Sequence, residues 1–223
     1  MENRKMNEAE SLELIASVIR SSRRELARNS YRPFLIWGYT TLVISLIEII
    51  LHLFAAESTS PTLRLYIWWS IPVIGGVLSY LLRDREEYTK SPLDLNIAAL
   101  WAWLGFAILP MISIIIIVGG TAGYLILPLI LLLMGVGAMI TGAMTRLKVV
   151  QWGGVAAFAG MLLIAALALW SKKSFGVAPT AEQGDLVEFF LIGQMIIFAL
   201  SFVGSMIIPG HYMKRMFNKP DAE

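Results

Sequence analysis

Long apolar runs alternate with short polar connections along the chain. Six such runs stand out, at 34–55, 64–82, 95–118, 121–144, 149–170 and 186–208. Each has about 18–25 residues, enough for a helix rising 1.5 Å per residue to cross a hydrocarbon core of ~30 Å. A helix also satisfies its own backbone hydrogen bonds, which an open strand in lipid does not. The pattern predicts an all-α polytopic membrane protein with a bundle of six transmembrane helices over 34–208.

Basic residues are distributed unevenly over the connections between these runs. All but three of the 18 lysines and arginines lie in the N-terminal segment, the second and fourth connections or the C-terminal segment. The three on the opposite side are Arg64, Lys172 and Lys173. Loops rich in lysine and arginine stay on the cytoplasmic side of a membrane. We therefore expect a multi-pass protein of the bacterial inner membrane, with the N-terminus and a C-terminal tail, 209–223, both in the cytoplasm.

Composition supports the membrane assignment and excludes several kinds of site. Hydrophobic residues make up 57% of the chain and charged residues 15%, against about 25% charged residues in a soluble domain. The cysteine count of 0 excludes disulfides, thiolate metal ligands and cysteine nucleophiles. The sequence contains no His-Glu-x-x-His motif, no Gly-x-Ser-x-Gly motif and no Walker-type glycine loop. We therefore expect no enzymatic activity and no cofactor.

Residues 1–33 form a polar segment before the first apolar run. Within it, residues 7–29 are expected to form a cytoplasmic amphipathic helix with Leu12, Ile15, Ile19 and Leu26 along one stripe. Five arginines cluster close to the membrane, namely Arg20, Arg23, Arg24, Arg28 and Arg32. Such a helix either lies on anionic headgroups, where each charge contributes ~1 kcal/mol, or docks a cytoplasmic protein partner or a second copy. Its stripe of about three turns is too short to predict nucleic-acid binding.

Ionisable side chains within a membrane are costly, so each one needs an explanation. The first apolar run contains Glu48 and His52, which are four residues apart and hence on one helix face. The last run contains Glu188 near its outer edge and Gln194 roughly 12 Å deep. Because the two runs cross in opposite directions, Glu48 and Gln194 are expected at similar depth in the outer half of the bilayer.

Two interpretations of these polar residues stay open. In the functional one they form an outward-opening site, which is a proton relay, a metal site or a solute pocket, because histidine titrates near neutral pH and binds zinc together with carboxylates. In the structural one, Glu48 pairs locally with His52, while His52 and Glu188 reach the headgroups. Three potential ligands on two helices are too few to assign a metal site, and none is assigned.

Several stretches rich in tryptophan and glycine carry a resemblance to known sequences. They are Phe34-Leu35-Ile36-Trp37-Gly38-Tyr39, the run from Ile67 to Gly76, Leu133-Met134-Gly135 through Gly142, Lys148, and Trp152-Gly153-Gly154. With these stretches the chain resembles, over most of its length, a group of uncharacterised multi-pass membrane proteins of Bacteroidetes-type bacteria. The resemblance implies the membrane topology, and it implies no activity and no site residue.

Small residues recur at the spacing that lets helices approach closely. Ala138 with Gly142, and Ala156 with Gly160, are expected to pack either inside the bundle or at a homodimer interface. Taken together, the patterns favour a non-enzymatic accessory or sensory membrane component that acts through a cytoplasmic partner. The alternative is a small permease for a proton-coupled solute or metal ion, using Glu48 and His52.

Overall fold

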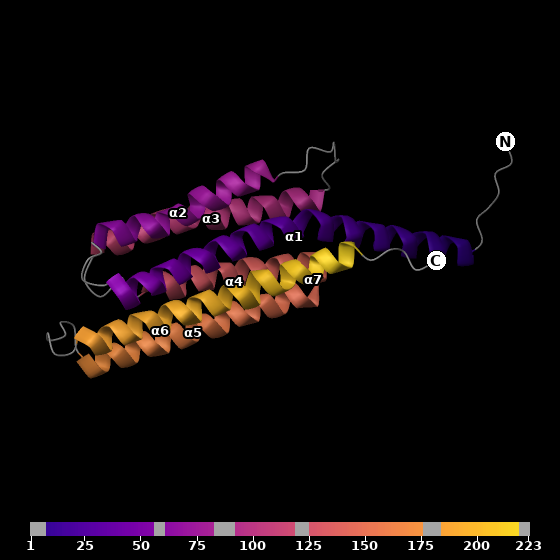
Figure 1. Cartoon of the computed structure of the whole chain (residues 1–223). Coiled ribbons are helices and arrows are strands. Elements are labelled where there is room, and N and C mark those ends of the chain that lie inside the picture. The colour runs from indigo at the N-terminus through magenta and orange to yellow at the C-terminus, as the bar shows by residue number, and fades with distance from the viewer. Residues whose placement is uncertain (1–7, 56–60, 83–91, 119–124, 176–183, 219–223) are drawn as a thin grey trace.

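The computed structural model of the protein describes residues 8–55, 61–82, 92–118, 125–175 and 184–218. These residues fold into helices and contain no strand. The helices are α1 (Glu8–Ala55), α2 (Pro61–Leu81), α3 (Pro92–Val118), α4 (Ile126–Thr145), α5 (Lys148–Phe175), α6 (Gly184–Phe202), the π-helix η3 (Val203–Ile207) and α7 (Ile208–Phe217). They run side by side along one direction, with the chain turning back between them (Figure 1). The predicted all-α class is confirmed for the described part of the chain.

Five described stretches are long and apolar enough to cross a membrane. They are Tyr31–Ala55, Pro92–Ile115, Ile126–Thr145, Lys148–Ser171 and Glu188–Met216. The helix α2 carries a shorter apolar stretch, Tyr66–Leu81. Large apolar side chains such as Phe54, Trp103 and Trp152 are exposed on the outer surface. Contiguous apolar surface of this kind is rare on soluble monomers, whereas lipid solvates it. The architecture is that of a membrane protein.

The long helix α1 runs through the middle of the bundle. It packs against α2 on one side and against α6, η3 and α7 on the other. The helix α5 pairs with α4 and also contacts α6 and η3, while α2 and α3 form an outer layer (Figure 1). Side chains from α1, α4, α5, α6 and α7 fill the centre, including Phe34, Leu131, Ile164, Phe198 and Met213.

Trp101 attaches α3 to the rest of the bundle. Its indole Nε1 donates a hydrogen bond to Thr141 Oγ1 in α4 at 3.1 Å. Its ring meets that of Phe34 in α1 edge to face, with the ring centroids 5.7 Å apart. A buried indole N–H normally needs such a partner, so this contact both satisfies the donor and positions α3.

Glycines allow α4, α5 and the last helix to approach one another closely. A β-carbon on Gly142 would lie 2.6 Å from the backbone nitrogen of Gln151, and one on Gly153 would lie 2.8 Å from the carbonyl oxygen of Ser205. Gly160 likewise lies directly against α6. Two of the expected small-residue positions, Gly142 and Gly160, therefore serve packing inside the chain.

The last helix does not end at residue 208, so the expected boundary between the last apolar run and the C-terminal tail 209–223 is not a helix end. The helix passes through η3 and continues as α7, in which Pro209, Gly210 and Met213 are buried. Proline has no N–H and its ring crowds the carbonyl four residues earlier. The wider π turn directly before Pro209 accommodates this ring, so the helix continues.

Residues 8–33, the described part of the N-terminal segment, and the first apolar run were expected as two elements and lie on one helix. The helix α1 has 48 residues, which corresponds to about 72 Å at 1.5 Å per residue. Pro33 lies inside it. Figure 1 shows the N-terminal part of α1 extending past the ends of the other helices. The expected boundary at residue 33 is therefore not a helix end.

Gly142→Ala is expected to destabilise the bundle, because the added methyl group meets the backbone of α5. We expect a loss of about 1–3 kcal/mol and a lower midpoint of thermal unfolding in detergent, followed by circular dichroism. Gly105→Ala is the matched control, since no atom lies within 4 Å of its β-carbon position. Equal midpoints for the two variants would contradict this account of the packing.

Candidate functional site

A row of polar side chains lies on one buried face of α1. Gly38 marks that face, since a β-carbon there would lie 2.8 Å from Ile207 of η3. Polar residues follow it along the helix at spacings of three or four, which keeps them on the same side. They are Thr41, Ser45, Glu48 and His52, and all are buried. This polar row therefore faces the helix formed by α6 and η3.

Glu48 and His52 are the ionisable members of the polar row. Their exposed fractions are 1% and 6%. His52 Nδ1 lies 3.7 Å from Glu48 Oε1 and 3.0 Å from the backbone carbonyl oxygen of Glu48. Because a carbonyl oxygen only accepts, Nδ1 is the donor in the shorter contact. The local pair expected from the i, i+4 spacing is confirmed, but His52 is buried in protein rather than exposed at headgroup depth.

Gln194 lies on α6 at the level of this pair. The contacts of Gly38 with η3 and of Gly210 with α1 define the antiparallel register of the two helices. In that register Gln194 is level with the turn between Glu48 and His52, which agrees with the similar depth expected from the sequence. Gln194 is 3% exposed, and its side-chain nitrogen has no hydrogen-bond partner among the described residues.

Two buried hydroxyl groups, one on α1 and one in η3, escaped the sequence analysis. Ser45 on α1 and Ser205 in η3 are fully buried, and the described residues provide no hydrogen-bond partner for either Oγ atom. Leaving a buried hydroxyl unpaired costs about 1–3 kcal/mol, so such groups are suited to bind water or a polar solute. Helical spacing from Glu48 is a signal that points to Ser45. No comparable signal points to Ser205, because the π turn shifts its face.

Glu188 does not join the pair. It is half-buried on α6 and lies six residues before Gln194, roughly 9 Å further along the helix axis. Among the residues that the structure describes, no three histidine, aspartate or glutamate side chains gather closely enough to hold a metal ion. The metal-site alternative therefore has no geometric support in the described part of the chain.

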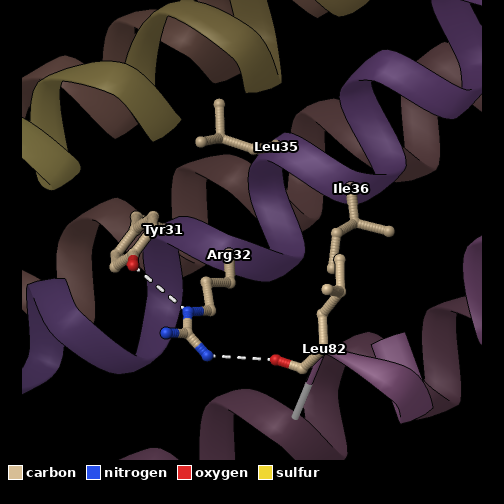
Figure 2. A pocket seen from close by; sticks show the side chains of 5 residues that line it. All are labelled: Tyr31, Arg32, Leu35, Ile36 and Leu82. Atoms are coloured by element: carbon tan, nitrogen blue, oxygen red, sulfur yellow. Dashed lines mark hydrogen bonds between the residues drawn. The ribbon is translucent and has the colours of Figure 1, made fainter. Parts of the chain in front are cut away.

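Arg32 is the N-terminal arginine whose side chain the structure describes. Its Nη1 donates to the carbonyl oxygen of Leu82 at 3.0 Å, and its Nε donates to Tyr31 Oη at 3.1 Å (Figure 2). The carbonyl belongs to the end of α2, where helix carbonyls lack partners within the helix. Arg32 therefore ties α1 to α2. The side chains of the other four lie outside the described part, namely Arg20, Arg23, Arg24 and Arg28.

Comparisons with known proteins identified no relative of the chain. No family model, no curated protein and no solved structure matches the chain. The resemblance to Bacteroidetes-type membrane proteins stays a prediction, and function is argued from the geometry of the chain itself.

Gln194→Met is expected to leave stability unchanged or to raise it. The change replaces a buried amide that lacks a described partner with an apolar side chain of similar length. The midpoint of thermal unfolding in detergent checks this. The reverse change at the neighbouring buried position, Met195→Gln, is the control and is expected to cost about 1–3 kcal/mol. A fall of the Gln194→Met midpoint as large as that of the control would show that the amide holds the bundle together.

Proposed function

We propose that the protein is a non-enzymatic sensory component of the bacterial inner membrane. It responds to protonation of the Glu48–His52 pair and acts on a cytoplasmic partner through the N-terminal part of α1. The observation that carries the proposal is the continuity of α1. A single helix bears the buried pair near one end and the arginine-rich segment toward the other.

The proposed orientation has six crossings, with α2 as the second, and both termini in the cytoplasm. It is supported by the uneven distribution of basic residues. It is also supported by Figure 1, where the N-terminal part of α1 and the end of α7 lie at the same end of the bundle. In this orientation Glu48 lies roughly 21 Å along α1 from Phe34, in the outer half of the bilayer.

Protonation changes the charge of a site that is closed to solvent. With His52 neutral and Glu48 ionised, the pair carries a negative charge, and one added proton cancels it. A buried charge is costly unless it is paired, so the two protonation states favour different packing of α1 against α6. Shifts of a packed helix by 1–2 Å are a common form of switching. Because α1 is continuous, a shift of its outer half moves its cytoplasmic end.

Two contacts hold α1 near the point where it leaves the bundle. Tyr39 Oη and His211 Nε2 share a hydrogen bond of 2.8 Å that links α1 to α7. Arg32 links α1 to the end of α2. In each contact α1 contributes one side chain. A small movement of α1 is therefore enough to break or remake them.

The extension of α1 beyond the bundle presents apolar groups to a partner. Leu12, the first residue of the predicted stripe, is 68% exposed, on the same helical segment as the arginines at positions 20–28. An amphipathic helix with an exposed apolar stripe fits a groove on another protein, and arginine supports pairing with an acidic rim. These features favour an acidic cytoplasmic protein as the partner.

A fluorescent label at one position tests the coupling along α1. The chain has no cysteine, so Leu12→Cys creates a single labelling site. In nanodiscs, the emission of an environment-sensitive label at position 12 is expected to change when the pH is lowered, because an added proton changes the charge of the buried pair and hence its packing. The same label in a Glu48→Gln background is expected to lose most of that change. Phe106→Cys, exposed on α3, is the matched control and is expected to show none.

An equal pH response with and without Glu48 would contradict the sensory function. The second candidate, a proton-coupled permease, is favoured by the polar row, in which Ser45 and Gln194 accompany the ionisable pair. Proton uptake into proteoliposomes that Glu48→Gln abolishes, together with no response at position 12, would select the permease.

A further inference from the structure

An open pocket lies between α1 and the end of α2, where α1 leaves the bundle. Its volume is about 370 Å³ and its lining surface is almost entirely apolar. Figure 2 shows the lining residues, with Arg32 stretching between the two helices. They are Tyr31, Arg32, Leu35, Ile36 and Leu82. Among the described residues that line the pocket, Arg32 supplies the charge and the others supply apolar surface.

The guanidinium of Arg32 is held in place at this pocket. Tyr31 Oη and the carbonyl of Leu82 accept hydrogen bonds from Nε and Nη1, and the guanidinium carbon lies 5.9 Å from the centre of the Tyr31 ring. A guanidinium suits phosphate because its planar donors match two phosphate oxygens. Because its position is already fixed, Arg32 loses less conformational freedom on binding a phosphate than a mobile side chain would.

We propose that this pocket binds one anionic phospholipid of the cytoplasmic leaflet. Its phosphate contacts Arg32, and one acyl chain lies against Leu35 and Ile36. Charge complementarity and the apolar lining together select this occupant, since basic pockets between transmembrane helices recognise anionic headgroups. Inorganic phosphate has no hydrocarbon to place against the pocket walls. The inference rests on the proposed membrane placement and deepens it, because the lipid contacts the α1–α2 junction that moves during signalling.

Lipid titration of the purified full-length protein tests the site. Binding of phosphatidylglycerol in detergent is measured by native mass spectrometry. Arg32→Gln is expected to weaken the tightest binding step about fivefold. Arg215→Gln removes an exposed charge on α7 and is expected to leave that step unchanged. Ile36→Trp fills the pocket without changing charge and is expected to weaken the same step, which keeps the test available if Arg32→Gln does not fold.

Binding measurements with two further ligands distinguish an anionic phospholipid from other occupants of the pocket. Phosphatidylcholine is expected to bind the native protein more weakly than phosphatidylglycerol, and inorganic phosphate is expected not to compete. If Arg32→Gln and Arg215→Gln weaken phosphatidylglycerol binding equally, the binding depends on diffuse charge attraction, and the proposed site is overturned. Unchanged binding in the Ile36→Trp variant, or competition by inorganic phosphate, would also overturn it. The lipid titration in detergent does not depend on the orientation of the protein in a membrane or on signalling. A negative result therefore overturns the lipid site alone, whereas a missing pH response at position 12 overturns the sensory function.

Discussion

Hydrocarbon offers no hydrogen bonds, and this constraint explains the main features of the molecule. Backbone groups are satisfied within helices, and helix continuity is kept even where proline opposes it. Pro33 lies inside α1, and Pro209 follows a π turn that lets the last helix continue into α7. Several polar side chains on the membrane-crossing stretches are turned inward, as the polar row on α1 shows. An inward polar group in a membrane protein is costly to keep, and such groups generally mark functional sites.

Close packing follows from the same constraint, since apolar surface gains little by leaving lipid for protein. Helices then associate where their backbones approach closely. Gly142 and Gly153 permit this along α5, and Trp101 adds a satisfied hydrogen bond between α3 and α4. Ser45 on α1 and Gln194 on α6 differ from these contacts, because each buries a polar atom for which the described residues provide no partner.

The sequence predicted the features that depend on local spacing. Helices α2 and α3 begin at Pro61 and Pro92, within three residues of the apolar runs, and the i, i+4 pair of Glu48 and His52 is present. Features that depend on contacts between distant residues were not predicted. No local pattern predicts that Arg32 donates a hydrogen bond to the carbonyl of residue 82. None predicts that a π turn allows the helix to continue past residue 209.

The continuity of α1 escaped prediction for a related reason. Its pattern changes from polar to apolar near Pro33, which looks like a boundary between two elements although the backbone remains helical. Whether the side chains of a helix are polar or apolar depends on what surrounds the helix, and the surroundings change where α1 enters the bundle. Hydrophobic patterning therefore found the apolar part of α1 and misplaced the helix end.

Continuity of α1 is the claim on which the proposed function depends, and one distance measures it. Spin labels on the exposed positions Leu12 and Leu46, introduced as cysteines, are 34 residues apart and hence about 51 Å apart on an unbroken helix. Electron–electron double resonance on the protein in nanodiscs is predicted to give a narrow distribution near that distance. A broad distribution, or a peak below about 40 Å where the rise of a straight helix no longer applies, would show that the helix breaks near Pro33 and would contradict coupling along α1.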